Sequence, residues 1–130
     1  MNIGLGNKRK TILLVDADPH ARAVMRNALE AAGFTVGEAA TGIEGERTTL
    51  RIRPDAVLAD LMLETIDAGG AIAEKLKTLG SQIPIYIVST ASDALIGAVG
   101  LRELGISGVF LKPSDPAIVI RALKTRLGVG

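Results

Sequence analysis

Four polar side chains follow short apolar runs of the sequence, and their types suggest a chemistry that they could perform together. Asp16, Asp60, Ser89 and Lys112 each stand at the end of such a run. Two carboxylates repel each other unless a cation lies between them, and all-oxygen ligation suits Mg²⁺. A carboxylate can also attack phosphorus to form an aspartyl-phosphate. With a lysine and a hydroxyl to hold the phosphoryl oxygens, the set predicts phosphoryl transfer onto Asp60.

Short apolar runs alternate along the chain with segments of helical spacing, and these elements must bring the four side chains together. The strands are expected at 11–15, 35–36, 56–59, 85–88 and 108–111, and the helices at 19–32, 43–51, 71–79, 94–104 and 116–127. This alternation predicts parallel strands joined by right-handed crossovers. The expected fold class is therefore α/β, a flavodoxin-like doubly wound five-stranded sheet of order 2-1-3-4-5 with five helices. Residues 10–128 are expected to form one domain after a flexible N-terminal arm, 1–9.

The first and last helices have clear start signals and apolar faces. Asp18-Pro19 and Asp115-Pro116 each combine an N-cap residue with proline in the first turn. Capping alone accounts for Asp18, and His20 in the first turn is expected at the surface. The residues expected to face the core are Ala21, Val24, Met25, Ala28, Leu29 and Ala32 in the first helix, and Ile118, Val119, Ala122, Leu123 and Leu127 in the last; Ile120 is expected to be exposed.

The overall composition narrows the possible functions. The chain has 130 residues, no cysteine, 48% hydrophobic and 2% aromatic residues, and a net charge of +1. Disulfides and thiolate sites are thus excluded, and a single basic run at Lys8-Arg9-Lys10 is too little to predict direct nucleic-acid binding. No apolar run approaches the length of a membrane span. We therefore expect a cytoplasmic protein that neither binds nucleic acid directly nor enters a membrane.

Four motifs then point to a known family. They are Ile-Leu-Leu-Val-Asp at 12–16, Pro-Asp-Ala-Val-Leu-Ala-Asp-Leu-Met-Leu at 54–63, Pro-Ile-Tyr-Ile-Val-Ser at 84–89 and Leu-Lys-Pro at 111–113. In this order, and over roughly residues 10–127, the chain resembles the receiver domains of two-component response regulators. The resemblance implies that Asp60 accepts a phosphoryl group from a sensor histidine kinase or a phosphotransfer protein.

The resemblance also implies roles for the other residues. Asp16, Asp60 and the backbone carbonyl of Met62 would hold Mg²⁺, Ser89 would follow the phosphoryl group, and Lys112 would pair with phosphorylated Asp60. The Lys112-Pro113 peptide is often cis in the family. The fourth and fifth helices would carry the signal, with a homodimer as one possible arrangement. Such a domain is not a conventional enzyme, because its only chemistry is its own phosphorylation and dephosphorylation at Asp60.

The sequence departs from the family at two points that matter here. Strand one usually ends in two adjacent acids, but the second position is Ala17, so Mg²⁺ binding should be weakened. The usual aromatic switch in strand five is replaced by Val109, while Phe110 should point to the opposite face of the sheet.

Ala17 keeps one alternative open, a pseudo-receiver that acts as a phosphorylation-independent interaction module. A hydrolase of the haloacid dehalogenase type would fit Asp16-x-Asp18 but needs a cap and further acidic motifs. A flavodoxin would need aromatic residues to hold its flavin.

Overall fold

The computed structural model describes residues 9–60, 82–89, 107–113 and 115–129 of the chain. The helices expected at 71–79 and 94–104 lie outside these residues, as does nearly all of the arm expected at 1–9. The described residues contain three helices, so the expected count of five remains a prediction. Of these three, none combines the length and apolar character that crossing a membrane requires.

Five parallel strands form one sheet, and their order confirms the predicted topology. The strands are β1 (Thr11–Val15), β2 (Thr35–Ala39), β3 (Ala56–Asp60), β4 (Ile85–Ser89) and β5 (Gly108–Leu111), arranged β2-β1-β3-β4-β5. The second strand extends beyond the two residues expected. Gly37 and Glu38 pair with Leu13 and Leu14 in register, so pairing with β1 overrides their low strand propensity.

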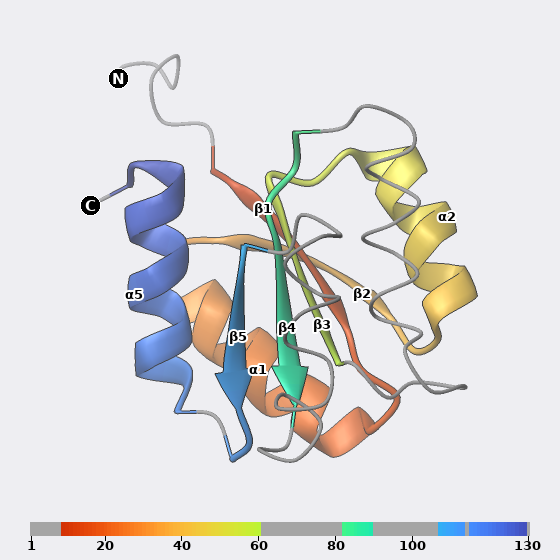
Figure 1. The fold of residues 1–130 in the computed structure, drawn as a ribbon, viewed down its shortest axis with the longest axis horizontal. Coiled ribbons are helices and arrows are strands. Elements are labelled where there is room, and N and C mark those ends of the chain that lie inside the picture. Colours follow the sequence, from red (N-terminus) through yellow and green to blue (C-terminus); the bar gives the residue numbers. More distant parts are fainter. Residues whose placement is uncertain (1–8, 61–81, 90–106, 114, 130) are drawn as a thin grey trace.

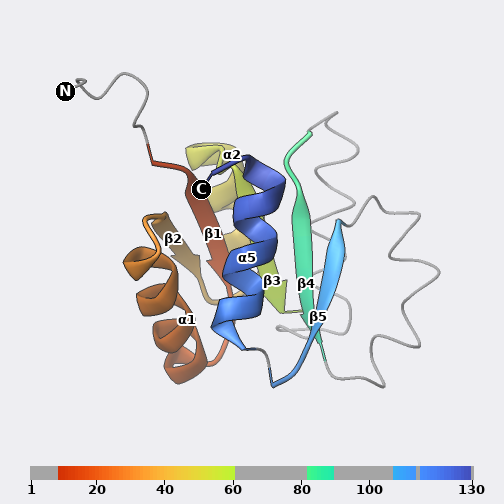
Figure 2. The same ribbon diagram turned by 90° about the vertical axis from the view of Figure 1, so that its left-hand side faces the viewer.

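The three described helices cover both faces of this sheet. They are α1 (Pro19–Ala31), α2 (Gly42–Ile52) and α5 (Pro116–Leu127). Figures 1 and 2 show α1 and α5 on one face and α2 on the other. Asp18 and Asp115 cap α1 and α5 as expected, because each carboxylate accepts a hydrogen bond at 2.9 Å from the backbone N–H two residues later.

The core is aliphatic and is divided by the sheet into two layers. One layer comprises Leu13, Val15, Ala39, Val57, Ala59, Ile85 and Ile87, with Ile52 of α2 packed against it. The other comprises Ile12, Leu14, Leu29, Phe34, Ala56, Leu58, Tyr86, Val119 and Leu123, beneath α1 and α5. The alternation of side chains along each strand produces this division. Phe110 belongs to the second layer and stacks on Tyr86, with ring centroids 5.4 Å apart, whereas Val109 is exposed.

Several expected core positions were wrong. Val24 is 48% exposed and Ile118 55% exposed, while Ile120 packs partly against the core. The buried stripe of α5 runs through Val119 and Leu123, with Ile120 beside it, and Ile118 falls on the other side. Val24 and Ala21 are both exposed because their side of α1 borders the pocket of the candidate functional site.

Thr41 at the start of α2 provides a test of the local structure. Its hydroxyl oxygen accepts a hydrogen bond at 3.0 Å from the Glu44 backbone N–H, and the Glu44 carboxylate accepts one at 3.1 Å from the Ala40 N–H. Thr41→Ala should therefore lower the free energy of unfolding by about 1 kcal/mol. Urea denaturation measures this change, and Thr41→Ser, which keeps the hydroxyl, is the control. Equal losses in both variants would contradict the capping role.

Candidate functional site

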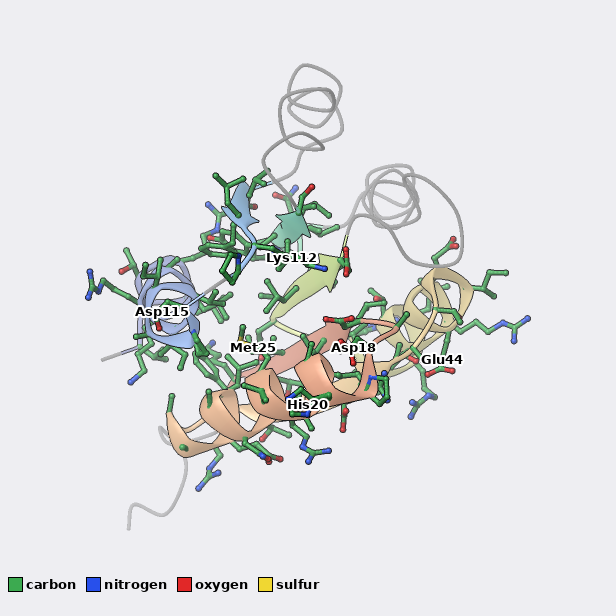
Figure 3. All side chains as sticks on the ribbon, turned by 90° about the horizontal axis from the view of Figure 1, so that it is seen from below. Asp18, His20, Met25, Glu44, Lys112 and Asp115 are labelled. Carbon is green, nitrogen blue, oxygen red and sulfur yellow. The ribbon has the colours of Figure 1, made fainter. Side chains whose placement is uncertain are left out.

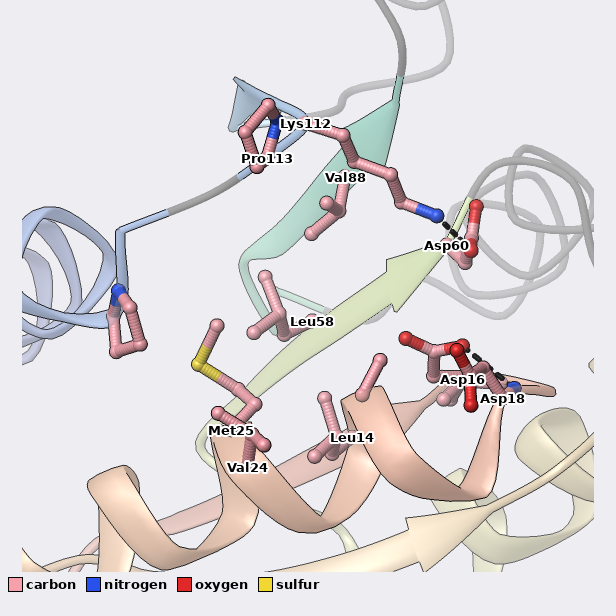
Figure 4. A pocket seen from close by; sticks show the side chains of 13 residues that line it. Leu14, Asp16, Asp18, Val24, Met25, Leu58, Asp60, Val88, Lys112 and Pro113 are labelled. Carbon is pink, nitrogen blue, oxygen red and sulfur yellow. Dashed lines mark hydrogen bonds and ion pairs between the residues drawn. The ribbon is translucent and has the colours of Figure 1, made fainter.

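A pocket of about 520 Å³ opens at the edge of the sheet where the strands end. Figure 3 views the molecule from this edge, with Lys112 and Asp18 facing the middle. The wall is largely aliphatic, and the polar groups gather at one end (Figure 4). The described lining residues are Leu14, Val15, Asp16, Asp18, Ala21, Val24, Met25, Leu58, Asp60, Val88, Lys112, Pro113 and Pro116. Three of the four residues singled out from the sequence, Asp16, Asp60 and Lys112, therefore meet here.

Asp60 and Lys112 form an ion pair across the end of the sheet. The Lys112 Nζ donates a hydrogen bond to Asp60 Oδ2 at 2.5 Å (Figure 4). Asp60 is only 8% exposed, at the end of β3. Lys112 follows β5, and its backbone N–H donates at 2.8 Å to the Ser89 carbonyl, which extends the pairing of β4 with β5. The Lys112–Pro113 peptide is cis.

The titration of Lys112 and Asp16 reflects their crowding around Asp60. Burial lowers the pKa of Lys112, but the hydrogen bond to Asp60 and the nearby carboxylates outweigh it, so the pKa is raised overall. Burial raises the pKa of Asp16, the Asp18 backbone N–H opposes this, and repulsion from Asp60 adds to the rise. The site therefore favours a charged lysine, and burial is the main reason that the pKa of Asp16 is raised.

Asp16 is held through its backbone as well as through its side chain. Its N–H donates to the Ala39 carbonyl at 3.1 Å, and its Oδ1 accepts from the Asp18 backbone N–H at 2.9 Å. Its carbonyl accepts from Arg22 Nη1 at 2.6 Å. Sequence reasoning missed Arg22; the signal available was an arginine in the second turn of a helix that starts next to the strand-end acid.

Ser89 and Met62, the other two residues expected in the site, are not among the described residues that line the pocket. Ser89 is buried, 2% exposed, at the end of β4, but it does not line the described part of the pocket. Asp60 pairs in register with Val88, so Ser89 lies one residue further along the neighbouring strand. Met62 lies outside the described residues, and its implied carbonyl ligand stays a prediction. Asp18 caps α1 and His20 is exposed, both as expected.

The donor groups at this edge fit a hard divalent cation with few protein ligands. Asp16 and Asp60 offer carboxylate oxygens, and their mutual repulsion would be relieved by a cation between them. Over the described ranges, no three acidic, histidine or cysteine side chains lie close enough to hold a metal by themselves. A cation here would keep several water ligands, which is the usual state of Mg²⁺ in proteins.

Glu38 on β2 joins two arginines of α1 beside the site and gives a pH test. It accepts hydrogen bonds at 3.0 Å from Arg26 Nη1 and from Arg22 Nε. These two bonds hold the pKa of Glu38 below its usual 4.5, and the bond from Arg26 has the larger effect. A carboxylate whose pKa is lower in the folded state than in the unfolded state stabilises the fold at pH values above the unfolded pKa. This contribution is lost as the pH falls through the folded-state pKa.

Wild type should therefore have a higher free energy of unfolding than Glu38→Gln. This difference should be constant near neutral pH and should shrink below pH 4.5. Urea unfolding at a series of pH values measures this difference. Glu46→Gln, on α2, is the control. A difference that grows toward acid would contradict the assignment.

Comparison with known proteins adds to this geometry. The model of the response regulator receiver domain family matches residues 12–124. The chain is 28% identical over 127 residues to the transcriptional regulatory protein PrrA of Mycobacterium leprae, covering 98% of this chain and 53% of that protein. It thus spans about half the length of the curated relatives it matches.

Solved structures give the same result. A putative response regulator from Chloroflexus aurantiacus superposes with a TM-score of 0.83 at 28% identity, covering 93% of this chain and 99% of that one. The receiver domain of a sensor histidine kinase from Pseudomonas aeruginosa, solved with a magnesium ion in its active site cleft, has a TM-score of 0.78 at 27% identity, covering 93% and 99%. From its motifs, its strand order and these matches, the chain belongs to the response regulator receiver domain family.

Proposed function

We propose that this receiver domain accepts a phosphoryl group on Asp60 from a sensor histidine kinase or a phosphotransfer protein. The observation that carries the proposal is the pair of Asp60 with Lys112, within a pocket that also exposes Asp16. A carboxylate at a strand end can act as a nucleophile, and a neighbouring ammonium can neutralise the charge that arrives on it.

The reaction is a transfer between a phosphorylated nitrogen and an oxygen of Asp60. An Asp60 carboxylate oxygen attacks phosphorus, the P–N bond of the donor imidazole breaks, and the imidazole recovers a proton. Lys112 exchanges its contact with the carboxylate for one with a phosphoryl oxygen, and the family resemblance implies a hydrogen bond from the Ser89 hydroxyl to another. Most of the catalysis is positioning and charge neutralisation, which these groups supply.

Mg²⁺ is the cofactor that we propose for this step, held by Asp16 and Asp60 with the Met62 carbonyl implied by the family resemblance. When bound, it would neutralise charge on the phosphoryl oxygens. The magnesium ion in the Pseudomonas aeruginosa receiver domain supports this cofactor. Ala17 is exposed and offers no ligand, so we expect binding weaker than a site with two adjacent acids would give.

The output of the domain is part of the same proposal. We propose that the fourth and fifth helices carry the signal, as the family resemblance implies, with a homodimer as one possible form. Of these elements, α5 is described here, and it begins three residues after Pro113, a residue of the pocket wall. Cytoplasmic localisation and the absence of any activity beyond self-phosphorylation and self-dephosphorylation also belong to the proposal.

Intact-mass measurement after incubation with acetyl phosphate and Mg²⁺ tests the function. The protein should gain the mass of one phosphoryl group, and hydroxylamine should remove it because an acyl phosphate is a reactive anhydride. No gain at millimolar Mg²⁺ would favour the pseudo-receiver, for which Ala17 is the one specific observation. Multiple turnover of generic phosphate esters would instead favour a hydrolase.

A further inference from the structure

Arg22 lies between the phosphoacceptor edge and the exposed side of β2. Its side chain is 20% exposed, and its guanidinium makes two directed hydrogen bonds. Nη1 donates at 2.6 Å to the Asp16 carbonyl, and Nε donates at 3.0 Å to Glu38 Oε1. A planar guanidinium that bonds through two of its nitrogens is fixed in orientation as well as in position.

Glu38, which accepts the bond from Arg22 Nε, is itself held in place. Its other oxygen, Oε2, accepts from Arg26 Nη1 at 3.0 Å, and its backbone pairs with Leu14 in the β1–β2 register. The carboxylate that orients Arg22 therefore belongs to a strand that runs alongside the one that leads into Asp16. The contact links the start of α1, the middle of β2 and the end of β1.

The bonds to Asp16 leave one side-chain oxygen for a ligand. The backbone N–H is used by Ala39, the carbonyl by Arg22 and Oδ1 by the Asp18 N–H. Over the described part of the chain, Oδ2 makes no hydrogen bond. The bonds at the Asp16 N–H and at its carbonyl hold the two peptides that flank its Cα, and they thereby fix the direction of the Cα–Cβ bond that carries the carboxylate.

We propose that Arg22 is a positioning residue for the metal site, because it fixes the backbone of Asp16 and with it the direction from which the Asp16 carboxylate enters the pocket. The inference rests on the proposed function. Arg22 bonds the carbonyl of Asp16 and not the carboxylate, so it acts through geometry. Since Ala17 leaves one strand-end carboxylate where the family has two, the orientation of that carboxylate carries more of the affinity.

Metal affinities of matched variants test the inference. Arg22→Gln removes both the carbonyl contact and one bond to Glu38. Arg26→Gln removes the other bond to Glu38 and the contacts with Asn27 and Glu30 but none with Asp16, and it is the control. Arg22→Lys keeps the charge but lacks the planar fork. For each protein, backbone amide NMR shifts during titration give the dissociation constants of Mg²⁺ and of Ca²⁺, and thermal unfolding gives the melting temperature.

Arg22→Gln should weaken Mg²⁺ binding about tenfold, the usual effect of losing an outer partner of a metal ligand. Ca²⁺ should lose less, because it tolerates irregular geometry whereas Mg²⁺ requires a near-octahedral site. Arg22→Lys should behave like Arg22→Gln, and Arg26→Gln should stay within about twofold of wild type, well below the effect of losing an outer partner. A change in folding stability alone would not alter the ratio of the Mg²⁺ affinity to the Ca²⁺ affinity.

Four outcomes would overturn the inference. Equal weakening in Arg22→Gln and Arg26→Gln would assign the effect to the Glu38 network, and equal loss of Mg²⁺ and Ca²⁺ would assign it to charge. Unchanged Mg²⁺ binding in Arg22→Gln, with wild type still binding the metal, would refute the positioning role while leaving the proposed function intact. If wild type itself binds no Mg²⁺, the metal part of the proposed function fails, and this inference fails with it.

Discussion

Asp60→Asn is expected to abolish phosphoryl uptake from acetyl phosphate. The amide has no carboxylate oxygen with which to attack phosphorus, so no acyl phosphate can form at this position. Intact mass before and after incubation with acetyl phosphate and Mg²⁺ measures the effect. Wild type should gain one phosphoryl group, and the variant none over the same time.

The loss should not come from misfolding. Asparagine has nearly the shape of aspartate, and the change also removes the repulsion between Asp60 and Asp16. Lys112 is 39% exposed, so water can solvate its ammonium once the carboxylate is gone. The free energy of unfolding should therefore change by no more than about 1 kcal/mol.

Asp18→Asn is the matched control for this prediction. Asp18 also lines the pocket, but it is explained by capping, and asparagine caps a helix as well as aspartate does. This variant should still take up a phosphoryl group. Loss of uptake in Asp18→Asn, with uptake retained in Asp60→Asn, would place the acceptor elsewhere.

Much of the fold could be predicted because its signals are local. Short β-branched runs and an aspartate followed by proline mark strands and helix starts without knowledge of their neighbours. The N-caps at Asp18 and Asp115 and the strand order confirm this. The length of β2 could not be predicted in this way. Gly37 and Glu38 have low strand propensity, and pairing with β1 is a tertiary effect.

The candidate site could be predicted from strand alternation. Asp16, Asp60 and Lys112 stand two residues after Leu14, Leu58 and Phe110, all of which belong to the core layer beneath α1 and α5. Each polar residue therefore continues the row of its own strand toward the same face, which explains why the three line one pocket.

Side-chain packing between elements was less predictable. Val24 and Ile118 have the spacing of core residues, but a helical period does not determine which side of the apolar stripe meets the core. Val24 borders the pocket, and Ile118 lies on the side of the α5 stripe away from Ile120. The contacts of Arg22 could not be predicted for a similar reason. Its partners, Glu38 and the Asp16 carbonyl, belong to β2 and to the loop after β1, and only the fold brings them together.

Lys112→Met is expected to slow phosphoryl uptake on the order of 100-fold, the usual effect of removing one donor from developing charge. Methionine keeps most of the length of the side chain but lacks the ammonium that donates to Asp60. Deconvoluted mass spectra taken over time give the rate. Lys124→Met, on α5 and outside the pocket, is the control and should match wild type.

The same change should also destabilise the folded protein, and a double-mutant cycle tests why. Lys112→Met leaves Asp60 nearly buried beside Asp16 without its cation, which should cost about 2 kcal/mol, between the values for exposed and buried pairs. Adding Asp60→Asn removes the negative charge that Lys112 neutralises in wild type, so the double variant should recover most of this loss in urea unfolding. Additive losses would mean that Lys112 stabilises the fold by packing, and that its ammonium has little effect on the charge of Asp60.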